Sequence, residues 1–460
     1  MPCQVAVLSS YGQDSVINLA VVDRLLAHQV NFTGFLDNRL PELFSDALLE
    51  GRLLLIDRAS LLKLNPGERR KVEAFAREHV VQCFDYVRDP GDRAEVNAAA
   101  EVWVNSALSA AGVESDGDAM PEQDAAVTLR FVRERAEAYL AQSELPFNEF
   151  TVHHLRGLVK TAPERFAELL EKLLARQDLD KIPPHHDALG AWLYAPRLAE
   201  LTGNPEWVRK FMTVLENVRR VRPRTPEGFI ASAGNIEDPL NFRGEFPGYS
   251  PCCIGSRDLV YNELFHFHAP VFAAAAKVSR DPFWLDQLTK LMRHLRDVHC
   301  DPKDGLPCHF SSHGKPGGVK WSRGAAHIVH GLALMLEVWP DIPIREEAAH
   351  FADRIGEGLL RCQTKGGLWH NIFDKDYSPV EVSGAVGFVA GYAALVGAGW
   401  LPEAKYAAML ERGRHGILHY CYRGGWAENC AGTGGAPHPE YYLRRPFNFL
   451  FNGQLGAALA

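Results

Sequence analysis

Most of the chain is organised as a repeat. From about Lys181 onward, helix-like stretches alternate with short segments in which a glycine precedes a large apolar residue, at Gly228, Gly305, Gly367 and Gly425. These glycines are 77, 62 and 58 residues apart. That spacing is typical of a helical hairpin followed by a loop.

A second motif recurs with the same offset. Leu-Thr-Gly-Asn-Pro-Glu-Trp at 201–207 returns as Val-Ser-Arg-Asp-Pro-Phe-Trp at 278–284, which is 77 residues later. In both copies Asn-Pro or Asp-Pro separates two helix-like stretches, which predicts the end of one helix and the start of the next. Repeats of this kind predict stacked αα hairpins, arranged as an open solenoid or as a closed toroid.

The N-terminal part follows a β-α-β pattern instead. Apolar, strand-like segments fall at 5–8, 31–36, 52–57 and 80–84, with helix-like segments between them, one of which begins at Asn65-Pro. We expect a small parallel α/β unit, which resembles the Rossmann-like, class I amidotransferase-like domains attached to some carbohydrate enzymes. It contains neither a G-x-G-x-x-G segment nor a nucleophile elbow, which favours a structural or oligomerisation role.

The two patterns meet at a linker. Residues 112–124 are polar and acidic and contain Gly and Pro. We therefore expect an α/β domain over 1–115, a linker over 116–124 and a helical domain over 125–460. The predicted fold class is mainly α, a helical toroid preceded by a small α/β domain.

Composition and charge exclude several functions. The formal net charge of −8 argues against nucleic-acid binding, and no apolar stretch is long enough to cross a membrane. The N-terminus enters a strand-like segment without a signal peptide, and the nine cysteines include no C-x-x-C pair, so we expect reduced thiols in a cytoplasmic protein. The sequence has no P-loop and no metal-ligand spacing, so we expect no cofactor and no metal. A homo-oligomer is compatible with these features.

Candidate functional residues cluster where a toroid would place its pocket, at the starts of inner helices and in the glycine-containing loops. They are rich in His, Trp, Tyr, Arg and carboxylates, which suits carbohydrates and favours acidic sugars. The candidates are His186, Asp187, Asn262, Glu263, His266, His309, His313, Trp321, Arg323, Trp369, His370 and Tyr441.

Two carboxylates are the strongest candidates for catalysis. Asp187 is expected at a helix start, where it is either a pocket carboxylate or a helix cap. Glu263 lies 77 residues after His186, in the equivalent place of the next repeat. If the rings of Phe265 and Phe267 enclose the Glu263 carboxylate, its pKa would be raised, as a general acid requires. The alternative is a solvated or salt-bridged helix residue.

The other clusters suggest substrate binding. Trp321 offers a flat face for a sugar ring and Arg323 a bidentate fork for a carboxylate, unless Trp321 is core and Arg323 pairs internally. The segments around Trp369-His370 and around Tyr441 either close a pocket or only hold the C-terminal end of the chain in place.

Residues 181–460 resemble the unsaturated uronyl hydrolases of glycoside hydrolase families 88 and 105. The resemblance rests on motifs that occur in the expected order. They are His-Asp-Ala-Leu-Gly (186–190), Pro-Arg-Thr-Pro-Glu-Gly-Phe (223–229), Trp-Ser-Arg-Gly (321–324), Gly-Leu-Trp-His (367–370) with Glu-Val-Ser-Gly (381–384), and Gly-Thr-Gly (432–434) with Pro-Glu-Tyr-Tyr (439–442).

The resemblance implies an (α/α)6 barrel that releases a 4,5-unsaturated uronic acid from the end of an oligosaccharide. In these families an Asp protonates C4, water adds at C5 and the hemiketal falls apart. Counting from Leu264-Phe265, the position of that Asp is held by Asn262, whereas counting back from Pro270 it is held by Glu263.

Three interpretations follow. The first is an uronyl hydrolase with Glu263 as proton donor. Asp187 would orient the water or take its proton, and Arg323 with His309 or His313 would hold the substrate carboxylate. The second is a related barrel enzyme that hydrolyses saturated glucuronides. The third is a catalytically inactive uronide-binding protein.

Overall fold

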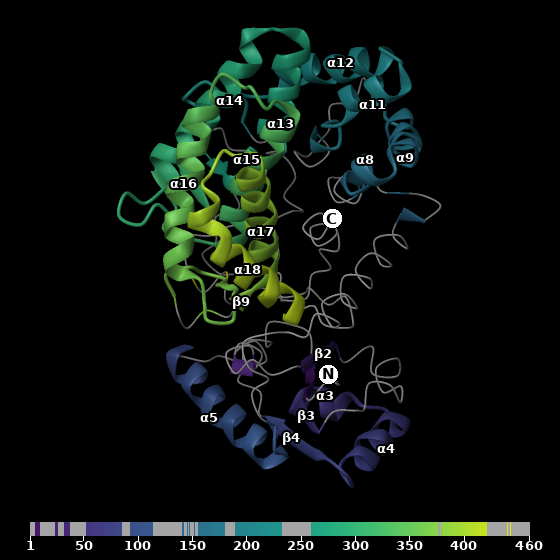
Figure 1. Cartoon of the computed structure of the whole chain (residues 1–460), viewed down its shortest axis with the longest axis vertical. Helices are drawn as coiled ribbons and strands as arrows, with labels where there is room; N and C mark the ends of the chain where they lie inside the picture. Colours follow the sequence, from purple (N-terminus) through teal and green to yellow (C-terminus); the bar gives the residue numbers. More distant parts are fainter. Residues whose placement is uncertain are drawn as a thin grey trace.

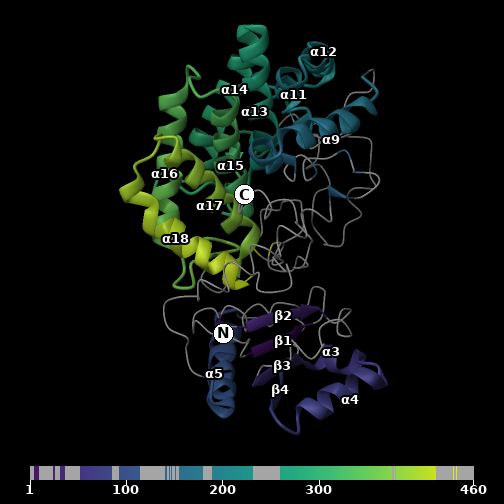
Figure 2. The same ribbon diagram turned by 45° about the vertical axis from the view of Figure 1, so that its right-hand side comes forward.

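A parallel sheet with its helices lies at one end of the molecule, and a layered array of helices lies at the other (Figures 1 and 2). The computed structural model describes residues 5–9, 24–25, 32–36, 52–84, 93–113, 140–141, 145, 147, 151, 155–179, 189–231, 259–375, 378, 380–420, 439 and 442. Within this part of the chain no helix is long and apolar enough to cross a membrane.

The N-terminal sheet has four parallel strands in the order β2-β1-β3-β4. Val5 of β1 lies opposite Phe32 of β2 and Leu53 of β3. The β-α-β pattern predicts this arrangement, whereas the likeness to amidotransferase-like domains and the domain boundaries remain predictions. The elements are β1 (Val5–Ser9), β2 (Phe32–Leu36), β3 (Leu53–Asp57), α3 (Arg58–Lys63), α4 (Pro66–Phe75), β4 (Val80–Phe84) and α5 (Arg93–Ala111).

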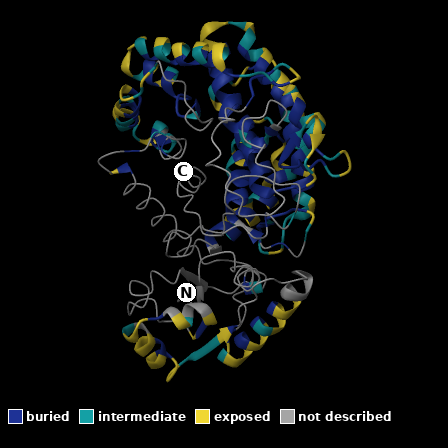
Figure 3. Cartoon of the chain, turned by 180° about the vertical axis from the view of Figure 1, so that it is seen from behind, coloured by how far each residue is buried: buried dark blue, intermediate teal, exposed yellow. Residues whose placement is uncertain are grey.

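The helical part is built from successive helix pairs, as the repeat predicts. One helix of a pair is almost entirely buried and the next exposes one face (Figure 3). The buried helices α13, α15 and α17 contact one another in that order, so they form an inner layer. The elements are α8 (Leu158–Thr161), α9 (Pro163–Ala175), α11 (Ala195–Thr202), α12 (Glu206–Val221), α13 (Asn262–Ser279), α14 (Pro282–His294), the π-helix η5 (Leu295–His299), α15 (Ser322–Val338), α16 (Arg345–Cys362), α17 (Val382–Gly397) and α18 (Glu403–Tyr420).

Short antiparallel strands join some of these pairs. Tyr261 of β5 lies opposite Phe310 of β6, at the start of the inner helix α13. These strands are β5 (Leu259–Tyr261), β6 (Phe310–Ser312), β7 (Lys315–Pro316), β8 (Trp369–His370) and β9 (Val380–Glu381).

The repeated glycines close the turns that follow the outer helices. Gly228, Gly305 and Gly367 have φ of 88°, 74° and 86°, which L side chains rarely adopt. A Cβ on Gly367 would lie 1.9 Å from the Arg412 carbonyl oxygen, so close approach also requires glycine there. The apolar residue after each of these glycines is buried. Gly425 lies outside the described residues.

The Asn-Pro and Asp-Pro pairs end and start helices, which confirms that prediction. α11 ends at Thr202 and α12 begins directly after Pro205. Asp281 caps α14, since its Oδ1 accepts a hydrogen bond from the Phe283 N–H at 2.9 Å, and Pro282 is the first helical residue.

Candidate active site

A cluster of polar side chains lies at the starts of the inner helices α13 and α15. Glu263 is in the first turn of α13, directly after β5. His309 precedes β6, and the pairing of Tyr261 with Phe310 brings it beside that turn. Gly324 in the first turn of α15 allows a close approach, since a Cβ there would lie 2.9 Å from Cδ2 of His309.

Glu263, His309 and Tyr442 form a hydrogen-bonded series. The Nε2 atom of His309 lies 2.8 Å and 3.0 Å from the two carboxylate oxygens of Glu263, and therefore carries the proton that it donates. The Nδ1 atom of His309 lies 2.8 Å from the Tyr442 hydroxyl. His309 is fully buried, whereas the Glu263 side chain is 16% exposed, so the carboxylate is the end of the series that solvent reaches.

The sequence predicts a raised pKa for Glu263, and this prediction is wrong. Burial does raise the pKa, but the hydrogen bond and charge of His309, together with His327, more than offset it and hold the pKa of Glu263 at about 2. Glu263 is therefore ionised at neutral pH. It suits a proton acceptor or an electrostatic stabiliser better than a proton donor.

Asn262 lies next to this hydrogen-bonded series but, unlike Glu263, is not reached by solvent. Its side chain is completely buried. Its Nδ2 donates to the Cys308 carbonyl at 2.9 Å, and its Oδ1 lies 2.6 Å from Nδ1 of His299. Both ends of the amide are therefore bound within the protein, which corrects the placement of Asn262 among the catalytic candidates.

Trp321 and Arg323 lie together behind His309. Trp321 is 1% exposed, and its ring centre is 4.4 Å from that of His309 and 5.7 Å from that of Tyr442. Its Nε1 donates to Asn371 at 2.8 Å. The ring is thus packed inside the protein, and the prediction of an open sugar platform is wrong. The Arg323 guanidinium carbon lies 4.4 Å from the centre of the same ring.

A group of buried histidines continues the site along the inner helices. The ring centre of His266 is 5.1 Å from that of His327 and 5.0 Å from that of His330. Burial, together with the charge of Arg156, lowers the pKa of His266 to about 3, so it is neutral. Within the described residues no group of three or more His, Cys, Asp or Glu is arranged to hold a metal ion.

Other predicted residues lie apart from this cluster. His313 is exposed in the turn between β6 and β7, with a positive φ of 50°. Trp369 is fully buried, donates from Nε1 to the Leu359 carbonyl at 2.9 Å and packs on Phe388, so it is a core residue and not a substrate contact. His370 is bonded through Nδ1 to the Ser378 carbonyl. His186, Asp187 and Tyr441 lie outside the described residues.

Sequence reasoning missed His327 and Tyr442. His327 follows Arg323 by one helical turn, a spacing that could have placed both on one face of α15. Tyr442 belongs to the Pro-Glu-Tyr-Tyr motif, but the sequence gives no sign of which tyrosine faces His309.

Known proteins resemble this chain in its C-terminal sequence and in its fold. The model of Glycosyl Hydrolase Family 88 matches residues 265–460. The match begins two residues after Glu263, and includes His309, Arg323 and Tyr442. No curated protein sequence matches the chain.

Solved structures extend the likeness. A possible member of the GH105 family from Klebsiella pneumoniae subsp. pneumoniae MGH 78578 has a TM-score of 0.61 at 17% identity, covering 75% of this chain and 94% of that one. A family 105 glycoside hydrolase of C. acetobutylicum ATCC 824 has a TM-score of 0.57 at 17% identity, covering 72% and 97%. An unsaturated glucuronyl hydrolase specific for heparin has a TM-score of 0.51 at 16% identity, covering 73% and 94%. The resemblance to families 88 and 105 that the motifs predict is thus confirmed, and the helical part of the chain is a barrel of their kind.

Proposed function

We propose that this protein is a glycoside hydrolase that releases a terminal 4,5-unsaturated uronic acid from an oligosaccharide by hydration of the double bond. The observation that carries the proposal is the ionised Glu263, held by His309 at the end of a helical barrel. The barrel and the family 88 sequence match support the reaction class.

The pKa of Glu263 assigns it to the second half of this reaction. Protonation of C4 leaves a cationic centre at C5 that is stabilised by the ring oxygen. A carboxylate whose pKa is about 2 stabilises that cation electrostatically. It is a weak base, but water that attacks a cation becomes acidic and needs only a weak base to take its proton. His309 keeps Glu263 ionised for both tasks.

The proton donor must then be another group. Asp187, the second carboxylate of the resemblance, is our candidate for the proton to C4, which exchanges the two roles expected from the sequence. His309 is already bonded to Glu263 and Tyr442, so Arg323 remains the candidate for the substrate carboxylate.

The same observation favours a second candidate function. Hydrolysis of a saturated glycoside also uses one ionised carboxylate and one carboxylic acid. Glu263 and Asp187 fit those two roles, so saturated glucuronides are the alternative substrates.

Two assays separate these functions. Hydration destroys the chromophore of an unsaturated uronyl disaccharide, so absorbance falls with time, whereas an aryl glucuronide reports saturated hydrolysis by releasing its aryl group. We expect the absorbance to fall with wild type and to stay constant with Asp187→Asn. Aryl release without loss of the chromophore would support the second candidate. Turnover of neither substrate, with a melting temperature raised by the disaccharide, would identify a binding protein.

A further inference from the structure

Asn262, the first residue of α13, binds two consecutive backbone carbonyl groups, those of Cys308 and His309. Its backbone N–H donates to the carbonyl of His309 at 3.1 Å, and its side-chain Nδ2 donates to the carbonyl of Cys308 at 2.9 Å. The next residue along α13 is Glu263, which accepts from the His309 ring. One residue thus sets the position of the segment that carries His309 against the helix that carries Glu263.

The orientation of this amide follows from chemistry. The Cys308 carbonyl can only accept a hydrogen bond, so the atom facing it must be the NH2 group. The oxygen of the Asn262 amide then faces Nδ1 of His299, 2.6 Å away, and this nitrogen must carry a proton. Burial holds the pKa of His299 well below its usual value, so the ring is neutral and its Nε2 accepts. It accepts from the hydroxyl of Ser311 at 2.9 Å.

The hydrogen-bonded chain continues through Ser311 to His294, which lies beside the partly exposed carboxylate of Glu227. Because the Ser311 hydroxyl donates to His299, its oxygen accepts from Nε2 of His294 at 2.8 Å. The Nδ1 atom of His294 lies 3.5 Å from a carboxylate oxygen of Glu227. Every link between Asn262 and His294 is buried and has one allowed direction.

A π-helix makes this chain possible. His294 ends α14 and His299 ends η5, five residues later. In an α-helix, residues five apart are about 140° apart around the axis. The i→i+5 pattern of η5, with the Cys300 N–H donating to the Leu295 carbonyl at 3.2 Å, brings both rings onto Ser311. Such π-segments are frequent at functional sites.

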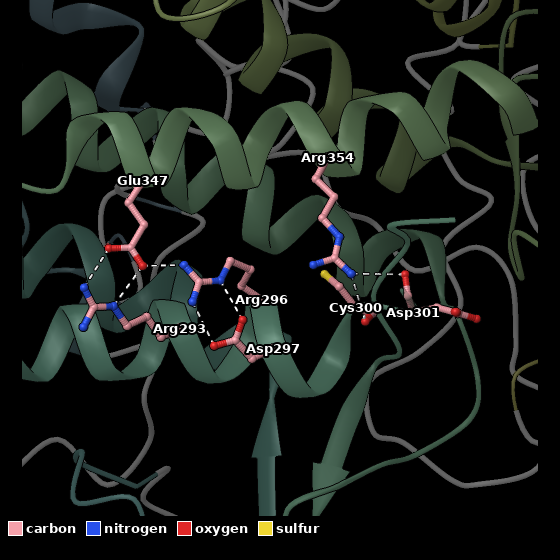
Figure 4. A network of polar contacts seen from close by, with 7 residues as sticks. All are labelled: Arg293, Arg296, Asp297, Cys300, Asp301, Glu347 and Arg354. Carbon is pink, nitrogen blue, oxygen red and sulfur yellow. Dashed lines mark hydrogen bonds and ion pairs between the residues drawn. The ribbon is translucent and has the colours of Figure 1, made fainter. Parts of the chain in front are cut away.

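Ion pairs on the outer face hold η5 in place (Figure 4). Glu347 of α16 binds Arg293 and Arg296, and Arg296 also binds Asp297 within the π-helix. Arg354 of α16 points at the carbonyl groups that follow η5.

We propose that Asn262 is a positioning residue for the Glu263–His309 pair, with its amide fixed by the buried chain His299–Ser311–His294 on the π-helix. This inference rests on the proposed function of Glu263. It also explains how an amide can stand where a family acid was expected: Asn262 orients the site and takes no part in proton transfer with the substrate.

Kinetics of Asn262→Ala on the unsaturated uronyl disaccharide test the proposal. We expect kcat to fall about 10- to 100-fold, because small misplacements of reacting groups have effects of this size, with KM within about 3-fold of wild type. Asn217→Ala is the matched control, since its Nδ2 also donates to a backbone carbonyl, that of Leu179 at 3.0 Å, on the outer helix α12. Equal kcat in both variants, both folded by melting temperature, would overturn the proposal.

Asn262→Asp is the conservative variant. A protonated carboxyl at this position reproduces the donor to Cys308 and the acceptor for His299, whereas an ionised one sets an anionic oxygen against the Cys308 carbonyl. Besides His299, the ionisable side chains nearest to it are Glu263 in α13 and His309 before β6. From α15 the neighbour is Gly324, which carries no charge. The ratio of its kcat to that of wild type should therefore fall as pH rises. A ratio that does not change with pH contradicts the proposed role.

A measurement that needs no turnover separates this proposal from the proposed function. In protein with 15N-labelled histidine, NMR should show His299 protonated at Nδ1 only. The His309 signals should shift in Asn262→Ala and not in Asn217→Ala. If wild type turns over no substrate but these shifts occur, the proposed function fails and the positioning stands. Unshifted His309 signals in Asn262→Ala would overturn the positioning, whatever the activity.

Discussion

The Nε2 atom of His309 lies 2.8 Å and 3.0 Å from the two carboxylate oxygens of Glu263, across 46 residues of sequence. This pair gives the site an anion that persists at neutral pH, because the pKa of Glu263 is held at about 2. The hydroxyl of Tyr442 completes the series on the other ring nitrogen.

The stability of the protein should depend on the ionisation of Glu263. Its pKa is about 2 in the folded protein against 4.5 as the ordinary value, so folding is favoured when the carboxyl is ionised. The contribution is on the order of 3 kcal/mol, complete above about pH 4.5 and lost as pH falls toward 2. Urea unfolding of wild type and Glu263→Gln should show a difference that shrinks over this range. A difference that is independent of pH would argue against the pair.

Tyr442→Phe should lower kcat by roughly 10-fold, because Nδ1 of the buried His309 loses its partner. The measurement is steady-state turnover of the unsaturated disaccharide. Tyr392→Phe is the control, since the hydroxyl of Tyr392 donates to the buried Ala352 carbonyl at 2.6 Å, between α17 and α16. We expect kcat of the control to equal that of wild type. A Tyr442→Phe variant as active as the control would contradict the role of Tyr442 beside His309.

Gly324→Ala should impair the site through packing alone. A methyl group there would lie 2.9 Å from Cδ2 of His309 and 3.3 Å from Nδ2 of Asn262. We expect a loss of about 1–3 kcal/mol in unfolding free energy and a lower kcat. Gly397→Ala, at the end of α17 with nothing within 4 Å, should leave both unchanged or raise stability slightly. Thermal unfolding and turnover of the two variants provide the comparison.

The repeat turns can be tested with another pair of glycines. Gly367 and Gly399 have φ of 86° and 74°, so alanine is strained at both. At Gly367 the added carbon would also lie 1.9 Å from the Arg412 carbonyl, while at Gly399 nothing lies within 4 Å. We expect a loss of about 1 kcal/mol for Gly399→Ala and about 3 kcal/mol or more for Gly367→Ala, measured by denaturant unfolding. Equal losses would mean that the turn does not pack as described.

Helix starts and turns are predicted well from the sequence, because each is determined by residues that are neighbours along the chain. The Asp281-Pro282 pair marks a helix start through its own backbone chemistry, and Gly305 marks a turn through its φ. The same holds for the parallel strand β3, whose apolar residues Leu53 to Ile56 are buried. The likeness to families 88 and 105 followed from motif order.

The site itself was less predictable, because it depends on contacts between distant segments. The aromatic neighbours of Glu263 suggest a raised pKa, but His309, brought close by the pairing of β5 with β6, reverses the shift. Trp369 is of a residue type that often binds sugars, yet its side chain packs in the core. No residue type signals the π-helix that brings His294 and His299 onto Ser311.

We propose that ionised Glu263 supports hydration of an unsaturated uronic acid. The most direct test is the loss of absorbance of an unsaturated uronyl disaccharide at neutral pH, with wild type and with Glu263→Gln. We predict that wild type consumes the chromophore and that Glu263→Gln is slower by about 100-fold or more. Consumption by Glu263→Gln at the wild-type rate would contradict the proposed role of Glu263.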